Sequence, residues 1–408
     1  MQPYEFLTKQ QVAQIHDATM QILQEVGIDF RYPPALEILK KGGAKVDGER
    51  VFFPAQLVEA QIKKAPAEFT LYARNSDCDV VIGGSHMAFI PGYGAPFVTD
   101  LDNGRREGAL LDFENFVKLT QASPDQDICS GMVIEPNDVP HEIRHAKMIY
   151  AAMKYSEKPF MGSAMGVQGA RDSIQMASIL FGSEDRLVEK PCMISILTSL
   201  TPLGYDERML GAIIEYARAG QPQLISALVI AGATGPTTLA GTLALQNAEI
   251  LAGIVLTQLV REGAPVVYSG SSSNTEMRSG ALSIGSPEMA VNAAATAQMA
   301  RFYNLPVRGG GAVSDGKVPD AQAAYESMMS LLTATLSGVN VVLHAAGILE
   351  GYITASYEKF IIDSEICGMC KRIKHGEQIN ADKLATDVIR SVGPGGEYLT
   401  HGHTFKHF

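Results

Sequence analysis

The chain has 408 residues, of which 46% are hydrophobic and 19% are charged. This composition excludes a disordered or fibrous protein and is typical of a globular protein with a large buried core. The formal net charge is −11 and no long run of Lys or Arg occurs, so we expect no nucleic-acid partner.

The first 85 residues predict a small, mainly helical N-terminal subdomain. Thr8 and Gln11 have the spacing of a capping box, and apolar residues then recur at helical spacing until Gly27, where we expect the first helix to end. Because the core of this unit would be modest, it should pack on the chain that follows. Two further helices are expected at 34–41 and 54–64, with a turn at 46–49 between them.

Residues 86–376 repeat one pattern, in which a short apolar run is followed by a loop and a longer helical stretch. Continuous apolar runs are typical of parallel strands that are covered by helices. The sequence therefore predicts an α/β protein, a (β/α)8 TIM barrel, over an open doubly wound sheet, whose phosphate-binding loop has no match here. The eight expected strands are 88–92, 128–134, 159–165, 192–199, 224–231, 265–271, 305–311 and 339–347.

The barrel prediction places the chemistry at the carboxyl ends of the strands. Side chains there are mostly polar and uncharged, or acidic, which favours a cationic or zwitterionic small molecule over a phosphorylated one. The basic residues near these ends are Arg278, Arg308 and Lys317. The polar and aromatic residues there are Tyr93, Phe97, Glu135, Asn137, Ser163, Thr201, Thr234, Ser271, Asn274, Glu276, Ser314, Asp315, His344 and Glu350.

Two of these residues, His344 and Tyr93, can be explained either by a functional role or by a structural one. His344 ends the last apolar run, so its ring should project into the barrel mouth, although a buried core histidine is the alternative. Tyr93 lies between two glycines, which leaves its ring free to face a ligand, and a structural tyrosine is nearly as good an explanation. Glycines 309–311, ahead of Asp315, predict a backbone with positive φ or one lying against a bulky group.

The segment His141-Glu142-Ile143-Arg144-His145 matches the HExxH pattern of zinc hydrolases. Pro140 precedes it and no third ligand follows at the usual spacing, so an exposed or helix-capping pair is the preferred interpretation and a zinc-dependent hydrolase the alternative. The single CxxC at residues 367–370 predicts two small buried residues rather than a metal site.

The N-terminal segment lacks the basic and apolar regions of a signal peptide, and no run of about 18 apolar residues is uninterrupted. We therefore expect no membrane span and a cytoplasmic protein. The five cysteines are an odd number spread over the chain, which favours reduced thiols over a disulfide framework.

The segment 315–326, which begins at Asp315 behind the glycine run, has the pattern D-x-K-x-x-D-x-Q-A-x-x-E. In this pattern it resembles the trimethylamine methyltransferase family. Residues 278–288 are similar to its R-x-G-x(4)-G-x-P-E pattern, and the HxHT segment at 401–404 matches as well. The likeness covers nearly the whole chain, and family members with known structure are (β/α)8 barrels.

This resemblance implies methyl transfer from a methylated amine to the Co(I) of a corrinoid that a separate partner protein carries. The founding members contain pyrrolysine, whereas this chain contains only standard residues. The resemblance therefore points to the non-pyrrolysine branch, which demethylates quaternary amines such as betaines. The family also implies no tightly bound cofactor, no metal site, a homo-oligomer, and a C-terminal tail at 377–408 that is short relative to other members.

A quaternary ammonium can lose a methyl group to a strong nucleophile and leave as a neutral amine, so no activating side chain is needed. Aromatic faces suit such a cation, and a betaine carboxylate needs hydrogen-bond donors. By matched position, the resemblance implies catalytic roles for Asp315 and Glu350. The substrate contacts that we expect are Tyr93, His344, Phe97, Asn274, Ser271, Ser314 and Tyr268. A non-catalytic betaine-binding barrel remains an alternative.

Overall fold

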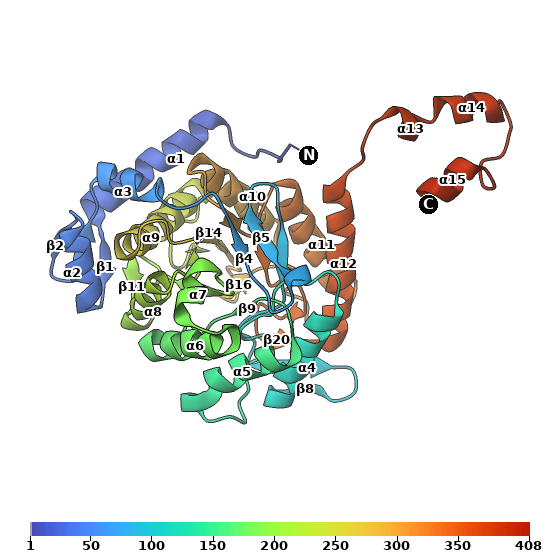
Figure 1. Cartoon of the computed structure of the whole chain (residues 1–408). Helices are drawn as coiled ribbons and strands as arrows, with labels where there is room; N and C mark the ends of the chain where they lie inside the picture. Colours follow the sequence, from blue (N-terminus) through green and yellow to red (C-terminus); the bar gives the residue numbers. More distant parts are fainter. Residues whose placement is uncertain (1) are drawn as a thin grey trace.

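The computed structural model describes residues 2–408, and a seven-stranded parallel sheet lies at its centre (Figure 1). Seven of the eight predicted apolar runs contribute a strand to this sheet. In spatial order, the strands are β6 (Ala88–Ile90), β18 (Val341–Leu343), β17 (Val307–Arg308), β14 (Val266–Gly270), β12 (Gln223–Ala227), β10 (Met193–Thr198) and β9 (Phe160–Met161).

The prediction of a regular strand at 128–134 was wrong, because this segment forms only isolated β-bridges. It nevertheless lies against both edges of the sheet. Asp127 and Cys129 donate their backbone N–H groups to the carbonyls of Phe89 and Pro159, at 2.8 Å in each case. The segment turns away from the regular ladder directly after these bonds, at the Ser-Gly pair of residues 130 and 131.

Helices surround the sheet, as Figure 1 shows, and polar residues define where many of them begin. Asp206, Ser286, Asp320 and Ser356 each accept a hydrogen bond from the backbone N–H three residues further on, which is the geometry of an N-cap. The helices are α4 (Leu110–Ala122), α5 (His141–Tyr155), α6 (Gly166–Phe181), α7 (Glu184–Glu189), α8 (Glu207–Arg218), α9 (Leu239–Val260), α10 (Pro287–Phe302), α11 (Ala321–Leu336) and α12 (Tyr357–His375).

Helix α9 is the one helix of the described chain that is long and apolar enough to cross a membrane. It has 22 residues, and 83% of its most apolar window is buried inside the protein. Its apolar character is accounted for by packing between the sheet and the N-terminal helices, since a helix that is hydrophobic on all sides is expected in a protein interior.

The side chains of the central strands pack alternately into two hydrophobic cores, because successive residues of a strand point to opposite faces of the sheet. The outer faces meet the helices in the larger core cluster. The inner faces form a second cluster together with Leu71 and Ile82 of the β4–β5 hairpin, which therefore lies against the amino ends of the strands. The strand residues of the inner cluster are Ala88, Ile90, Met161, Ile194, Leu224, Val267, Val341 and Leu343.

The N-terminal segment contains the predicted helices and capping box, together with short strands that the sequence analysis missed. Strand β1 joins this segment to the rest of the chain, since it pairs with β3 on one side and with β11 (Gly204–Tyr205) on the other. The elements are α1 (Lys9–Gln21), the π-helix η1 (Ile22–Val26), β1 (Ile28–Phe30), α2 (Pro33–Lys41), β2 (Lys45–Asp47), β3 (Arg50–Phe52), α3 (Ala55–Ile62), β4 (Glu68–Leu71), the 3-10 helix η2 (Ser76–Cys78) and β5 (Val80–Gly83).

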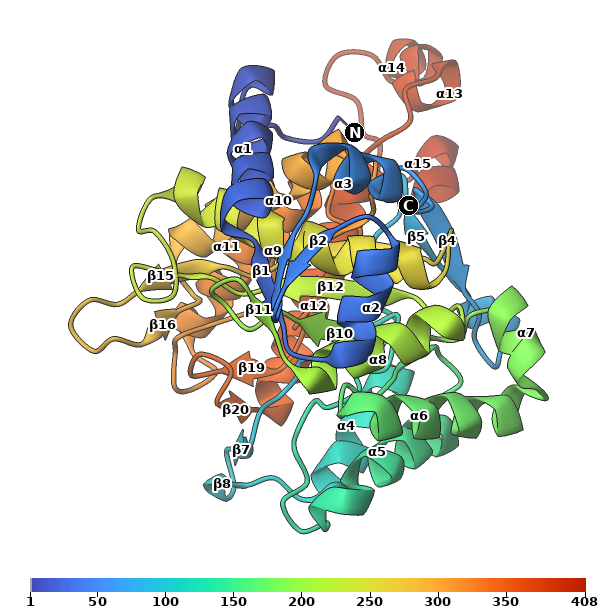
Figure 2. The ribbon, with the colours of Figure 1, turned by 90° about the vertical axis from the view of Figure 1, so that its left-hand side faces the viewer.

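Short hairpins follow the carboxyl ends of several strands. Figure 2 shows β7, β8, β15, β16, β19 and β20 on one side of the molecule and β4 and β5 on the opposite side. The site described below therefore faces the hairpin side. The hairpin strands are β7 (Phe97–Asp100), β8 (Gly104–Glu107), β15 (Ser273–Thr275), β16 (Leu282–Ser283), β19 (Ile348–Leu349) and β20 (Thr354–Ala355), and β13 (Ile230–Ala231) pairs in parallel with β15.

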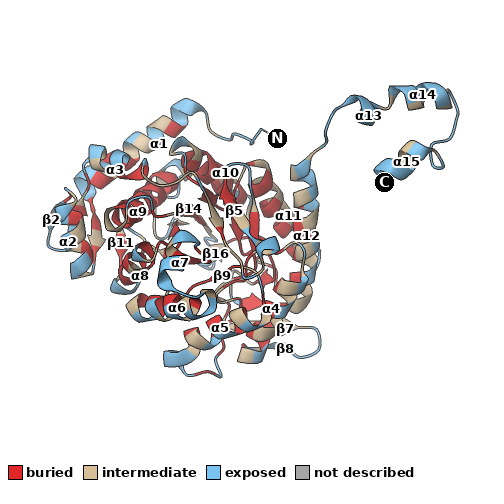
Figure 3. Ribbon diagram, in the orientation of Figure 1, coloured by how far each residue is buried: buried red, intermediate tan, exposed pale blue. Residues whose placement is uncertain are grey.

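The C-terminal segment extends away from the body of the protein beyond α12 (Figure 1). It carries α13 (Ala381–Leu384), α14 (Thr386–Val392) and α15 (Gly402–His407), none of which has a buried residue. Figure 3 shows the contrast between this exposed arm and the buried centre of the body.

Candidate active site

A row of polar side chains crosses the inner face of the sheet near the carboxyl ends of its strands. Ser226 on β12 is in register with Ser269 on β14, and Ser269 is in register with Arg308 on β17. The two serines lie two residues after Leu224 and Val267, which belong to the inner cluster, so they share its face. The three polar residues therefore occupy one layer above the apolar interior.

The members of this row lack protein partners. The hydroxyls of Ser226 and Ser269 and the Nε and Nη1 atoms of Arg308 are buried without a hydrogen bond to the described residues. Arg308 is 1% exposed, and no carboxylate within residues 2–408 forms an ion pair with it. Burying an unpaired guanidinium is costly, so this arrangement is typical of a site that an anionic ligand group completes. A carboxylate matches the donors.

His344 lies beside this row in a defined protonation state. Its Nδ1 accepts the backbone N–H of Tyr93 at 3.1 Å, so the neutral ring carries its proton on Nε2. Burial, and secondly the charge of Arg308, hold the pKa of His344 well below its ordinary value. His344 has a φ of 66°, and its carbonyl accepts the N–H of Ala312 at 2.8 Å.

The Tyr352 ring and the backbone of Tyr93 contact the His344 imidazole. The ring of Tyr352 lies 4.6 Å from that of His344, and its buried hydroxyl has no protein partner within the described chain. Tyr93 packs on the inner apolar cluster. Burial, with a smaller effect of the charge on Glu135, raises the pKa of Tyr93 to about 12. The Tyr93 phenol and the His344 imidazole are therefore both neutral near pH 7.

The β19–β20 hairpin that carries Tyr352 is held in an unusual conformation. Glu350 and Tyr352 have φ values of 51° and 74°, a region that side-chain-bearing residues rarely adopt, and Gly351 between them has 62°. The Glu350 carboxylate forms an ion pair with Arg105 at 2.9 Å, and that guanidinium lies 4.3 Å from the centre of the Phe97 ring. Glu350 and Phe97 thus connect two hairpins at the mouth.

Asp315 and Ser314 form part of the loop structure next to the site. The Asp315 carboxylate accepts the backbone N–H groups of Ile284 and Gly285, each at 3.0 Å. The Ser314 hydroxyl donates to the buried carboxylate of Glu326 at 2.7 Å. Both side chains therefore fix the loops that follow β17 and precede α10.

Of the remaining predicted contacts, Asn274 and Tyr268 lie away from the inner face that carries the Arg308 row. Asn274 lines a separate cavity of about 180 Å³ between α9 and α10, where it accepts a hydrogen bond from Ser286. Ser271 follows β14 and is 6% exposed. Tyr268 belongs to the outer, helix-facing cluster, and its hydroxyl donates to Asn247 at 2.9 Å.

The structure thus brings together Tyr93 and His344 of the predicted contacts. The structure adds Tyr352 beside His344. It also adds the Arg308 row, which sequence reasoning missed as a ligand site. A signal was present for Arg308, because an arginine inside the apolar segment 305–311 must either be paired or face a ligand. The two serines gave no such signal, since serine is small and uncharged.

The HExxH segment forms no metal cluster within the described residues. His145 pairs with Asp172 at 2.8 Å, Arg144 pairs with Glu135, and His141 and Glu142 are exposed on α5. Over residues 2–408, one group of potential metal ligands lies close together, on the C-terminal arm: Asp382, His403 and His407. Lys406 forms an ion pair with the carboxylate of Asp382. Cys367 and Cys370 are buried on α12, as predicted.

Comparisons with known proteins agree with the family expected from the motifs. The family model "Trimethylamine methyltransferase (MTTB)" matches residues 1–408. The chain is 54% identical to a glycine betaine methyltransferase of Desulfitobacterium hafniense, over 99% of this chain and 84% of that protein. It is 34% identical to a proline betaine:corrinoid methyltransferase of Eubacterium limosum, again over 99% of this chain and 84% of that protein.

Among solved structures, the monomethylamine methyltransferase MtmB of Methanosarcina barkeri is similar with a TM-score of 0.61. The likeness covers 97% of this chain and 82% of that chain at 12% identity, so it supports the fold alone. The chain belongs to the trimethylamine methyltransferase family. This confirms the predicted family and enzyme class, a methyltransferase.

Proposed function

We propose that the protein transfers a methyl group from a betaine, a quaternary amine with a carboxylate, to the Co(I) of a corrinoid carried by a separate protein. The observation that carries this proposal is the unpaired, buried Arg308 in register with Ser269 and Ser226, whose charge acts on the neighbouring side chains of His344 and Tyr352. This combination supplies donors for an anion at depth and a weak cation site above it.

The carboxylate of the betaine binds Arg308 and the two serine hydroxyls. Charge-assisted hydrogen bonds of this kind contribute about 1.5–3 kcal/mol each. They also fix the orientation of the substrate, because the deep end of the pocket offers donors and the mouth does not. With the carboxylate at depth, the quaternary nitrogen and its methyl groups point to the mouth.

The ammonium group lies among Tyr93, Tyr352 and the neutral imidazole of His344. An aromatic face attracts such a cation by about 0.5–2 kcal/mol, which is a modest contribution. A modest attraction favours turnover, because positive charge on nitrogen disappears toward the transition state and a strong cation site would stabilise the ground state. The depressed pKa of His344 serves this purpose by keeping a second positive charge out of the pocket.

The reaction breaks one N–CH3 bond and forms one Co–CH3 bond. The electron pair of the broken bond stays on nitrogen, so the leaving group is a neutral tertiary amine and no proton transfer is needed. The partner's Co(I) supplies the nucleophile, and the chain's residues orient the methyl group along the line of attack. Asp315 and Glu350 act on the pocket through the loops and hairpin that they hold.

Further features fit this proposal. The backbone bonds of residues 127–129 to β6 and to the residue before β9 support a closed eight-stranded barrel, and residues 2–85 support a subdomain packed on it. A reducing cytoplasm suits Co(I) and the five free cysteines. The corrinoid belongs to the partner, and the chain has no tightly bound cofactor of its own. Exposed apolar side chains on the C-terminal arm, including Leu399 and Phe405, support a homo-oligomer.

A spectroscopic assay tests the proposed reaction. The chain is mixed with a Co(I) corrinoid protein and either glycine betaine, choline or trimethylamine, and the visible absorbance of cobalt is followed. We expect methyl-Co(III) and one equivalent of dimethylglycine with glycine betaine, and slower reaction with the two amines that lack a carboxylate. Binding of glycine betaine without any change at cobalt would instead support a non-catalytic betaine-binding barrel.

A further inference from the structure

Six exposed apolar side chains lie in loops that follow the carboxyl ends of the central strands. Between residues 9 and 375, every large hydrophobic residue that is exposed and lies outside a helix is found in a loop after the carboxyl end of a strand of the central sheet. The loops that lead into these strands carry none of them. The six residues, here called the apolar ring, are Leu101, Met165, Leu200, Met277, Val318 and Ile353.

The topology brings these six residues to one side of the molecule. They follow β6, β9, β10, β14, β17 and β18, which are six of the seven strands of the central sheet. Because parallel strands end at the same edge, their following loops surround the same opening. Figure 2 shows the hairpins β7–β8, β15–β16 and β19–β20, whose turns carry three of the six, together on this side.

The end of the sheet opposite the apolar ring is closed to the site. The β4–β5 hairpin covers the opposite end, where Leu71 and Ile82 pack into the inner cluster. A surface hollow of about 1030 Å³ also lies at that end, next to His86 and Asn340, but the inner cluster separates it from Arg308. A reagent as large as a corrin ring must therefore come through the apolar ring.

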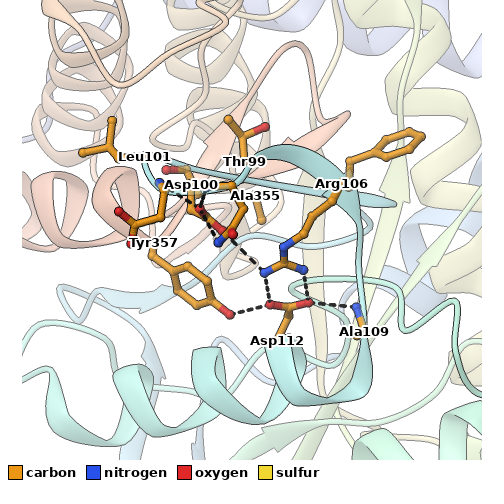
Figure 4. Close-up of polar contacts among 12 residues, drawn as sticks. Thr99, Asp100, Leu101, Arg106, Ala109, Asp112, Ala355 and Tyr357 are labelled. Carbon is orange, nitrogen blue, oxygen red and sulfur yellow. Dashed lines mark hydrogen bonds and ion pairs between the residues drawn. The ribbon is translucent and has the colours of Figure 1, made fainter.

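The hairpin that carries Leu101 is fixed in place before any partner binds. Figure 4 shows Arg106 of β8 joined to Asp112 of α4, with nitrogen–oxygen distances of 2.6 and 2.7 Å. Tyr357 of α12 donates to the same carboxylate at 2.7 Å, and the backbone N–H of Leu101 donates to Glu358 at 3.0 Å. Two helices thus hold the hairpin, which lowers the entropy lost when its tip is bound.

We propose that the apolar ring is the surface on which the corrinoid protein docks, with the corrin ring over the mouth and the partner's apolar residues against these six side chains. The inference rests on the proposed function, which requires a corrinoid to reach the substrate methyl groups. Large apolar side chains that are exposed around one opening are expected at a protein interface, and their burial supplies the affinity.

The test replaces two members of the apolar ring and one matched residue elsewhere. Leu101, Met277 and Ile179 are each 78% exposed, and Ile179 lies on the outer side of α6, away from the mouth. The double variant Leu101→Asp/Met277→Asp and the control Ile179→Asp are assayed with glycine betaine and two acceptors: a purified Co(I) corrinoid protein and free cob(I)alamin. Isothermal titration with glycine betaine shows that the pocket is intact.

We expect the ring variant to raise the KM for the corrinoid protein roughly tenfold or more, while its rate with free cob(I)alamin and its betaine affinity stay unchanged. Ile179→Asp should match the wild type with both acceptors. An unchanged KM in the ring variant would overturn the docking surface, as would a wild type that methylates free cob(I)alamin but no corrinoid protein. A wild type that methylates neither acceptor would contradict the proposed function itself.

Discussion

At the scale of single residues, Arg308 decides both the chemistry of the pocket and its cost to the fold. A guanidinium buried without a carboxylate destabilises the free protein, because its lost hydration is not replaced. Because the Arg308 guanidinium has no carboxylate partner in the protein, it should bind a substrate carboxylate strongly. Stability and affinity should therefore respond in opposite directions when this side chain is removed.

Arg308→Met should lower the affinity for glycine betaine by about 10- to 100-fold, since one charge-assisted contact is lost. The same substitution should raise the free energy of unfolding by about 1 kcal/mol or more. Calorimetric titration and urea unfolding measure the two effects. The matched control is Arg278→Met, at an exposed arginine near the mouth, which should change neither quantity. A variant that loses affinity and stability together would show that Arg308 is a structural residue.

The depressed pKa of His344 gives the stability a defined dependence on pH. The unfolded chain takes up a proton on this residue near pH 6.5, whereas the native protein does not, so the native protein loses stability as the pH falls below about 6.5. The loss from this residue is at most about 1.4 kcal/mol per pH unit. His344→Gln, which keeps an acceptor for Tyr93, should flatten the profile measured by urea unfolding at several pH values. An equally steep profile in that variant would contradict the assignment.

At the scale of elements, helix α12 holds the segment that follows β18. The Lys359 ammonium on α12 pairs with Asp363 one turn away and donates to Ser327 at 2.7 Å. Asp363 accepts the backbone N–H of Gly347 at 2.8 Å, three residues after His344. This fully buried pair therefore ties the segment after β18 to the helix layer.

Lys359→Met should destabilise the protein by about 3–5 kcal/mol, because it leaves the Asp363 carboxylate buried without its partner. The double variant Lys359→Met/Asp363→Leu should recover part of that loss, as it removes the second charge as well. Urea unfolding of the two single variants and the double variant measures the coupling. A double variant that is as unstable as the sum of the single variants would indicate that the two residues act independently.

The elements that were predictable from the sequence are those with long, repeated patterns. Continuous apolar runs identified seven strands of the central sheet, and the capping residues Thr8 and Gln11 identified the first helix. Strands of two or three residues, such as β1 and β11, are too short to show a period and were missed. The apolar run at 128–134 follows no regular ladder, because local hydrophobicity does not encode hydrogen-bond geometry.

The candidate site was predictable in part for a similar reason. Tyr93 and His344 stand at the ends of apolar runs, where a barrel places its functional residues. Arg308, Ser226 and Ser269 lie within strands, and their alignment depends on register across three strands. Register is a property of the assembled sheet, so a list of strand ends does not reveal it.

At the scale of the whole molecule, the body and the C-terminal arm differ in their packing. The body has two apolar cores, whereas the helices α13 to α15 have no buried residue. Folding of the body should therefore not depend on the arm. The apolar side chains that the arm exposes have no cover within the described chain.

Removal of residues 377–408 should leave the midpoint of urea unfolding and the affinity for glycine betaine unchanged, because no core contact is lost. The same truncation should reduce the oligomeric state, which light scattering of the intact and shortened chains measures. The contradicting outcome is that the intact and the shortened chains are both monomers and the shortened chain is markedly less stable. This result would show that the arm stabilises the body directly.

The central claim is that the substrate lies with its carboxylate at depth and its methyl groups at the mouth. A crystal structure of the protein with glycine betaine tests this most directly. The account predicts carboxylate oxygens within hydrogen-bond distance of Arg308 and the quaternary nitrogen between Tyr93 and Tyr352. A betaine bound in the opposite direction, or at another site with the Arg308 row empty, would contradict it.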